Sequence, residues 1–237
     1  MATFVLIHGA WTGGWFWWRV ANVLRDAGHR VVRPTLTGLG ERAHLATKDV
    51  DLNLHIADVV NSLRYEDVNR VVLAGHGYGG TVLTGAADRE PARIHHLVYV
   101  DAFTPENGQS TLGVAGPQLA ARMQTAAKEK GEGWLVPMPF DLSEFGITAE
   151  VDTRWITHRL TPMPLKALEQ QLKLTGGIPA RLPRTCIHAT RSNVPPFGEV
   201  AARARASGWR YKEVDTGYFS PVTDPKAVAQ LLIECAP

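Results

Sequence analysis

Short apolar runs alternate with longer amphipathic segments along most of the chain. The runs are rich in β-branched and aliphatic residues, which is typical of buried strands. They predict strands over residues 3–9, 30–35, 70–76, 96–102, 184–190 and 211–217. The amphipathic segments predict helices near 15–27, 53–64, 78–89, 197–206 and 224–234. This alternation predicts an α/β fold, with a mostly parallel central sheet flanked by helices.

The regular alternation breaks between residues 104 and 177. The stretches "PENGQS", "GEGW", "PMPFDL" and "TPMPL" in this region are rich in turn-forming residues. Because the region lies between two predicted strands, we interpret it as a small inserted cap over the carboxyl edge of the sheet, where open α/β sheets bind ligands. The predicted core domain is therefore formed by residues 1–103 and 178–237, and the cap by 104–177.

Composition narrows the range of partners. The chain has 237 residues and a formal net charge of +2, from 25 Lys and Arg against 23 Asp and Glu. We expect no nucleic acid or membrane partner, because no basic run stands out, and we expect a small molecule as substrate or ligand. The amino-terminal segment predicts a core strand, so we expect a cytoplasmic protein. A homodimer is compatible with the sequence, which does not fix the oligomeric state.

The sequence "LAGHGYGG" over residues 73–80 is similar to the pattern G-x-S-x-G, in which a nucleophilic serine lies at a sharp strand-to-helix turn. With five further stretches in the same order, the chain resembles the α/β-hydrolase superfamily, in its small-cap esterase and hydroxynitrile-lyase-like branch. The resemblance covers nearly the whole chain and implies the α/β-hydrolase fold. The five stretches are "VLIHGAWTGGWFW", "PTLTGLGERAHL", "LVYVDAFTPENGQS", "LTPMPL" and "DTGYFSPVTDPKAVAQLL".

The resemblance also implies where a Ser-His-Asp triad would lie. Gly77 stands at the serine position of the turn, and Tyr218 stands at the histidine position. The usual acid position falls on Ser192 or Asn193, whereas Asp101 matches an alternative acid position one strand earlier. We therefore expect a degenerate triad that does not support ordinary serine hydrolysis.

Backbone donors do not depend on these side chains. The resemblance places an oxyanion hole at the N–H groups of Tyr78 and Ala10, with Trp11 as an alternative to Ala10. Tyr218 is a candidate catalytic proton donor, or an aromatic residue that fills the space of a histidine. Asp101 is a candidate general base, or a residue that orients a substrate hydroxyl; its structural alternative is a cap for the turn that follows.

Several residues are candidates for the substrate pocket. Trp11 follows the predicted oxyanion turn, and the cap contains aromatic residues, one or two of which we expect to be pocket walls. Adjacent His95 and His96 point to opposite faces of a strand, and no group has metal-ligand spacing, so we expect no metal and no cofactor. The pocket candidates are Gly77, Trp11, His8, Trp134 and Trp155, with Phe140 and Phe145 as further cap aromatics.

These features lead to one favoured hypothesis and two alternatives. We expect a cofactor-independent, non-hydrolytic lyase, cyclase or isomerase that acts on a small aromatic or polyketide-like metabolite through oxyanion stabilisation and proton transfer. One alternative is a non-catalytic binding protein or receptor. The other is an esterase inactivated by substitution, which requires changes at both residue 77 and residue 218.

Overall fold

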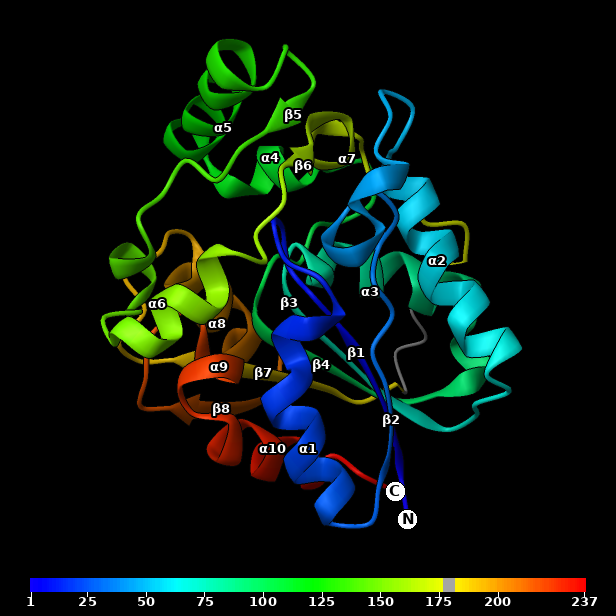
Figure 1. Cartoon of the computed structure of the whole chain (residues 1–237). Helices are drawn as coiled ribbons and strands as arrows, with labels where there is room; N and C mark the ends of the chain where they lie inside the picture. Colours follow the sequence, from blue (N-terminus) through cyan, green and yellow to red (C-terminus); the bar gives the residue numbers. More distant parts are fainter. Residues whose placement is uncertain (177–181) are drawn as a thin grey trace.

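The central sheet of the computed structural model, which describes residues 1–176 and 182–237, contains six strands in the order β2-β1-β3-β4-β7-β8 (Figure 1). Every neighbouring pair runs parallel. The carboxyl ends of all six strands therefore meet at one edge. The strands are β1 (Thr3–Ile7), β2 (Arg30–Val32), β3 (Val71–Gly77), β4 (Ile94–Ala102), β7 (Arg184–Ala189) and β8 (Arg210–Val214).

Helices cover both faces of this sheet. One apolar cluster joins α1 and α10 to one face, and the other face packs against α2, α3 and α8. The sheet-covering helices are α1 (Trp18–Asp26), α2 (Leu52–Tyr65), α3 (Gly79–Arg89), α8 (Phe197–Ala206) and α10 (Pro225–Ile233). Shorter elements connect them: η1 (Gly14–Trp17), η2 (Gly40–Leu45), η3 (Pro91–Arg93) and α9 (Ser220–Thr223).

The segment between β4 and β7 lies over the carboxyl edge of the sheet (Figure 1). It includes a two-stranded antiparallel pair, β5 and β6, beside its longest helix, α5. Its expected boundary, between residues 177 and 178, lies outside the described residues. The elements are α4 (Thr111–Ala115), α5 (Pro117–Lys130), β5 (Leu135–Val136), η4 (Leu142–Phe145), α6 (Glu150–Thr157), β6 (Met163–Pro164) and α7 (Leu165–Glu169).

The α/β architecture with a mostly parallel sheet confirms the prediction, although several element ends differ. The second strand ends at Val32, two residues before Pro34, which has no N–H to donate to a neighbouring strand. The helix expected over 15–27 is divided into η1 and α1. No helix among the described residues combines the length and the apolar composition needed to cross a bilayer.

The positions of side chains along β4 determine which face of the sheet each one points to. Val98 and Val100 of β4 point into the cluster under α1 and α10, whereas Tyr99 points to the opposite face. The register pairs Val100 with Ile187 of β7. Beyond this pair the regular alternation of β4 is interrupted: Asp101 has a φ of +36°, and the pairing with β3 passes from Val100 to Ala102.

Glycines allow α3 to pack closely against the sheet, directly after the turn that joins β3 to α3 (the elbow). A Cβ at Gly79 would lie 2.7 Å from the backbone oxygens of Ile7 and His8, and a Cβ at Gly80 would overlap the backbone oxygen of Phe103. Backbone atoms have little freedom to move aside in a packed core. Close approach of α3 to β1 and β4 therefore requires glycine at both positions.

Matched alanine substitutions test this constraint. Gly80 and Gly198 are each the second residue of a helix, but nothing lies within 4 Å of a Cβ built at Gly198. We expect Gly80→Ala to lower the free energy of unfolding by at least about 2 kcal/mol, through overpacking. We expect Gly198→Ala to leave it unchanged or to raise it by up to about 1 kcal/mol, through helix propensity. Urea denaturation measures both; equal stabilities of the two variants would contradict the close approach.

Candidate active site

The strand-to-helix elbow is intact at the carboxyl end of β3. Gly77 closes the strand with a φ of +53°, a left-handed conformation that glycine adopts without strain. Tyr78 follows, and α3 begins at Gly79. The N–H of Phe103 donates to the carbonyl oxygen of Gly77 over 3.0 Å, which ties the elbow to the end of β4. The elbow therefore presents residue 77 at the sheet edge in the way a nucleophile would be presented.

The hydroxyl of Tyr218 lies directly against Gly77. A Cβ at residue 77 would overlap this hydroxyl oxygen. The phenol ring is held from several sides: it stacks on Phe197 with ring centroids 5.0 Å apart, and it lies 4.4 Å from His76 and 5.1 Å from Phe145. Tyr218 thus fills the space that a side chain at residue 77 would need.

Burial, together with the negative charge of Asp101, raises the pKa of Tyr218 above its ordinary value. The hydroxyl therefore keeps its proton at neutral pH. It is a hydrogen-bond donor toward the elbow and is not a base.

One side-chain and one backbone hydrogen bond anchor the turn that contains Ala10 and Trp11. The indole Nε1 of Trp11 donates to the carbonyl oxygen of Val136 over 2.8 Å. The N–H of Thr161 donates to the carbonyl oxygen of Trp11 over 2.9 Å. Trp11 has a φ of +62°, which is unusual for a residue with a side chain. These contacts fix the turn to the β5–β6 part of the cap.

The Tyr78 side chain is anchored to α2, and not to the cap. Its hydroxyl and the Nδ1 atom of His55 are 2.9 Å apart, and the Nε2 atom of His55 is 2.9 Å from the carbonyl oxygen of Thr37. Because a carbonyl only accepts, Nε2 carries the proton and Nδ1 accepts from Tyr78. The N–H groups of Ala10 and Tyr78 donate to no backbone acceptor in the described turns and loops. They remain available for a carbonyl oxygen.

A small cavity of about 20 Å³ lies at the elbow, and a larger groove of about 710 Å³ leads to it. Leu119, Phe140, Phe145 and Val194 line both, so the two spaces adjoin. The cavity admits about one water molecule or one carbonyl group, and the groove has the size of a small-molecule site. The other cavity residues are Ala10, Trp11, Tyr78, Phe103, Met123, Leu168, Phe197 and Tyr218.

Asp101 lies near the carboxyl end of β4 and is hydrogen-bonded to β7. Its Oδ1 is 2.7 Å from the Nδ1 of His188, and the carboxylate also accepts from the N–H of Ala189 at 3.1 and 3.2 Å. Burial raises the pKa of Asp101, an effect that the bond to His188 opposes. The same hydrogen bond raises the pKa of His188, with a further contribution from Glu213. The pair joins β4 to β7 and does not line the elbow cavity.

Two buried histidines near the elbow are hydrogen-bonded to the backbone. His8 accepts from the N–H of Leu36 at Nε2 and bonds the carbonyl oxygen of Gly9 at Nδ1; burial lowers its pKa to about 4. His76 bonds the carbonyl oxygen of Tyr218 over 2.9 Å, and burial lowers its pKa to about 3. Both rings are therefore neutral at pH 7, and His76 positions the backbone of Tyr218.

The structure brings some of the sequence candidates together and separates others. Ala10, Trp11, Tyr78 and Tyr218 line one cavity beside Gly77. Phe140 and Phe145, considered among the cap aromatics, line it too.

Trp134, Trp155 and His8 do not reach this cavity. Trp155 packs against Trp15 and Arg19, and the indole of Trp134 turns toward Glu132. Composition alone did not show which cap aromatics face inward, since this depends on how the cap packs.

The hydrogen-bond partners of Asp101 lie on β7, and the catalytic role expected for Asp101 stays a prediction. Its carboxylate contacts neither the cavity nor the turn that follows it, because its partners are on β7. His188 was not among the sequence candidates. The signal that could have found it is its place near the end of a strand expected beside Asp101. Among the described residues, no group of three or more His, Cys, Asp or Glu side chains is arranged to hold a metal ion.

Comparison with known proteins defines the class. A family model described as the alpha/beta hydrolase family matches residues 4–231, and the chain belongs to this family. It is 39% identical, over 98% of both chains, to the carbendazim hydrolyzing esterase of Nocardioides sp. strain SG-4G. It is 30% identical to methylesterase 2 of Arabidopsis thaliana, over 72% of this chain and 64% of that one.

A solved structure is similar over the full length. An extracellular α/β-hydrolase from a Paenibacillus species matches with a TM-score of 0.89 and 25% identity, covering 100% of this chain and 99% of that one. That protein is described as sharing structural and functional homology with tobacco salicylic acid binding protein 2.

These comparisons correct the functional expectation from the sequence. The hypothesis of a non-hydrolytic lyase, cyclase or isomerase is wrong, because the relatives that align over most of the chain are named esterases. That hypothesis rested on the identities of residues 77 and 218. It gave too little weight to the hydrolytic family as a whole.

A double-mutant cycle tests the contact between Gly77 and Tyr218. Gly77→Ala carries a left-handed strain of about 1–2 kcal/mol in any background, and in the wild type it also meets the Tyr218 hydroxyl. In a Tyr218→Phe background the nearest ring carbon, Cζ, is 3.6 Å from the new Cβ, an ordinary contact. We expect the alanine to cost at least about 1 kcal/mol more in the wild type than in Tyr218→Phe, measured by denaturant unfolding. Equal costs would show that the hydroxyl does not occupy this space.

The Asp101–His188 pair predicts a pH effect. His188 has a raised pKa in the folded state, so its contribution to stability is complete below its ordinary value of 6.5 and is lost as pH rises through the folded pKa. We expect NMR titration of the His188 ring to give a pKa above 6.5, and Asp101→Asn to lower it. A pKa that does not respond to Asp101→Asn would contradict the assignment of the carboxylate as the main cause.

Proposed function

We propose that this protein hydrolyses small ester-type carbonyl substrates at the elbow, with water as the nucleophile and the backbone N–H groups of Ala10 and Tyr78 as the oxyanion hole. One observation carries the proposal: Ala10 and Tyr78 line a single cavity beside Gly77. Trp11, the neighbour of Ala10, is hydrogen-bonded to the cap, and the Tyr78 side chain is hydrogen-bonded to His55 of α2. Relatives named as esterases support hydrolysis as the reaction.

A degenerate triad is part of this proposal. Gly77 offers no nucleophilic side chain, and Tyr218 keeps its proton because burial raises its pKa. A covalent acyl-enzyme at residue 77 is therefore excluded chemically, and the attacking oxygen comes from water. In the balanced reaction, water adds to the carbonyl carbon, the bond to the leaving oxygen breaks, the alcohol takes one proton, and the acid releases its own to solvent.

The residues at the elbow would act by stabilising charge. The carbonyl oxygen becomes negative as water adds, and two fixed N–H donors in an apolar cavity favour that charge. The protonated hydroxyl of Tyr218, which also lines the cavity, would donate a further hydrogen bond to a substrate oxygen there. Enzymes that lose a whole catalytic triad retain about 10³–10⁴-fold acceleration over water from the oxyanion hole and binding. We propose an acceleration of this order for the present chain.

The adjoining groove indicates the shape of the substrate. Its inner walls are Leu119, Phe140, Phe145 and Val194, and an ion pair between Arg122 and Glu144 lies among its lining residues. Such walls favour a flat or extended apolar body, with the scissile carbonyl at the inner end. Carbendazim and simple methyl esters are the first substrates to assay, because the names of the relatives refer to them.

Obstruction of the passage provides the test. Leu119 lines both the groove and the cavity, whereas Leu45 is 42% exposed and lines neither. We expect Leu119→Trp to reduce hydrolysis of carbendazim and of 4-nitrophenyl acetate at least about tenfold, because it separates the two spaces. Leu45→Trp should leave the rate unchanged. Equal loss in both variants, or none in Leu119→Trp, would contradict a reaction at the elbow.

The form of the kinetics distinguishes the mechanism. We expect product to appear linearly from the start, without a burst, and the pH profile to lack an imidazole inflection near 6.5, because His8 and His76 have pKa values of about 4 and about 3. Gly77→Ser combined with Tyr218→His should introduce both the burst and the imidazole inflection. A wild type that binds these substrates and returns them unaltered would overturn the proposed hydrolysis.

A further inference from the structure

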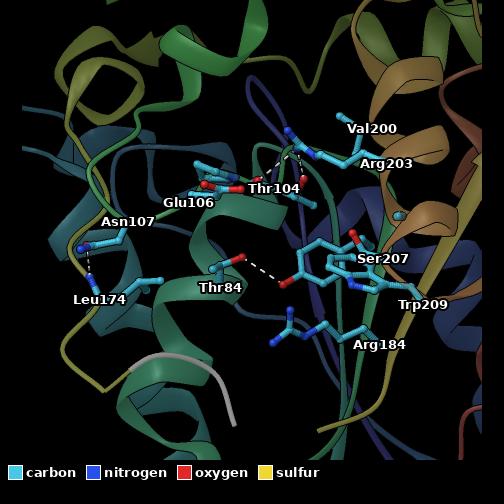
Figure 2. A pocket seen from close by; sticks show the side chains of 13 residues that line it. Thr84, Thr104, Glu106, Asn107, Leu174, Arg184, Val200, Arg203, Ser207 and Trp209 are labelled. Atoms are coloured by element: carbon cyan, nitrogen blue, oxygen red, sulfur yellow. Dashed lines mark hydrogen bonds between the residues drawn. The ribbon is translucent and has the colours of Figure 1, made fainter. Parts of the chain in front are cut away.

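A second cavity, of about 390 Å³, lies on the α3 and α8 side of the sheet (Figure 2). It shares no lining residue with the elbow cavity or with the groove. Its volume falls within the range of small-molecule sites. Its described lining consists of Thr84, Tyr99, Thr104, Pro105, Glu106, Asn107, Leu174, Arg184, Val200, Arg203, Ala204, Ser207 and Trp209.

The floor of this cavity is aromatic and fixed in place. The rings of Tyr99 and Trp209 are 4.9 Å apart at an angle of 38°. The Thr84 hydroxyl donates to the carbonyl oxygen of Gly80 over 2.7 Å, so it accepts from the Tyr99 hydroxyl at 3.0 Å. Figure 2 shows this bond beside the indole of Trp209. The hydrogen bond and the ring contact give the floor an aromatic surface of defined position.

Two guanidinium groups approach this floor from different elements. Arg203 comes from α8, and Arg184 comes from the start of β7, with Trp209 between them in Figure 2. The Arg184 guanidinium lies 5.4 Å from the Trp209 ring. Glu106 is the one acidic residue in the described lining. The described lining therefore carries a net positive charge.

The guanidinium of Arg203 has donors left for a ligand. One terminal nitrogen donates to the Thr104 hydroxyl over 2.7 Å and lies 3.3 Å from the Thr104 carbonyl oxygen. The other N–H groups of Arg203 make no hydrogen bond with the described residues. A guanidinium presents several donors in one plane, which match the two oxygens of a carboxylate.

We infer that this second cavity binds a small aromatic carboxylate, with the ring on Trp209 and the carboxylate at Arg203. The aromatic floor contributes apolar contact, and Arg184 adds positive charge at the same face. A tetrahedral inorganic anion would use the charge but not the aromatic surface. The inferred ligand class is therefore a planar ring that carries one carboxylate, and the inference is independent of the reaction at the elbow.

Calorimetric titration of the whole protein with sodium benzoate tests this inference, with inorganic phosphate as the second probe. Arg203 and Arg205 both lie on α8, but the Arg205 guanidinium rests on Tyr211 and lies outside the cavity. We expect Arg203→Gln to weaken benzoate binding at least about tenfold. Arg205→Gln and Tyr218→Phe should not change it. Ser207→Trp, at an exposed position of the lining, should abolish binding by filling the cavity and serves if Arg203→Gln does not fold.

Several outcomes would overturn the inference. One is a wild type that does not bind benzoate; another is equal affinity in wild type and a folded Arg203→Gln variant. Loss of benzoate binding in Tyr218→Phe would place the ligand at the elbow instead. Tighter binding of inorganic phosphate than of benzoate would show a simple anion site, in which the aromatic floor has no role.

Discussion

The Tyr218 hydroxyl occupies the space that a side chain on Gly77 would need, and this constrains the chemistry of the candidate active site. Nothing larger than hydrogen fits on residue 77 while the hydroxyl is in place. The phenol has little freedom to move, because Phe197 stacks on its ring and His76 holds its backbone. Residues 77 and 218 are therefore coupled through space: a side chain at one requires a smaller or differently shaped residue at the other.

The backbone of the elbow does not share this constraint. Tyr78 is held from α2 by His55, and the turn after β1 is held from the cap by the indole of Trp11. These anchors preserve the two N–H donors whatever side chain occupies residue 77. Charge stabilisation can consequently persist where nucleophilic attack by a side chain has been lost. The proposed hydrolysis rests on this separation of backbone and side-chain roles.

Much of the fold could be predicted from the sequence, because strand and helix periodicities are local properties. Both ends of the helix over 197–206 agree with the structure, and β4 ends at Ala102 as predicted. The positions of Gly77 and Tyr218 at the elbow also follow from matching short stretches of sequence to a family. The end of β2 was predicted less well, since Pro34 limits the strand.

Contacts between distant segments were not predictable in the same way. The Asp101–His188 bond joins residues 87 positions apart and depends on the register of β4 against β7. The inward-facing cap aromatics are Phe140 and Phe145, and Trp155 faces Trp15 instead. The cap lacks a regular hydrophobic period, so its packing, which decides this orientation, was not available from the pattern. Both features arise from tertiary packing.

The proposed hydrolysis requires that water, and no side chain, attacks the substrate carbonyl. Intact-protein mass spectrometry, on samples quenched during turnover of 4-nitrophenyl acetate, tests this requirement. We expect 4-nitrophenol to accumulate while the wild-type protein keeps its unmodified mass, and Gly77→Ser with Tyr218→His to show a transient acetyl adduct. An acetyl adduct on the wild type that forms and decays at the rate of turnover would contradict attack by water.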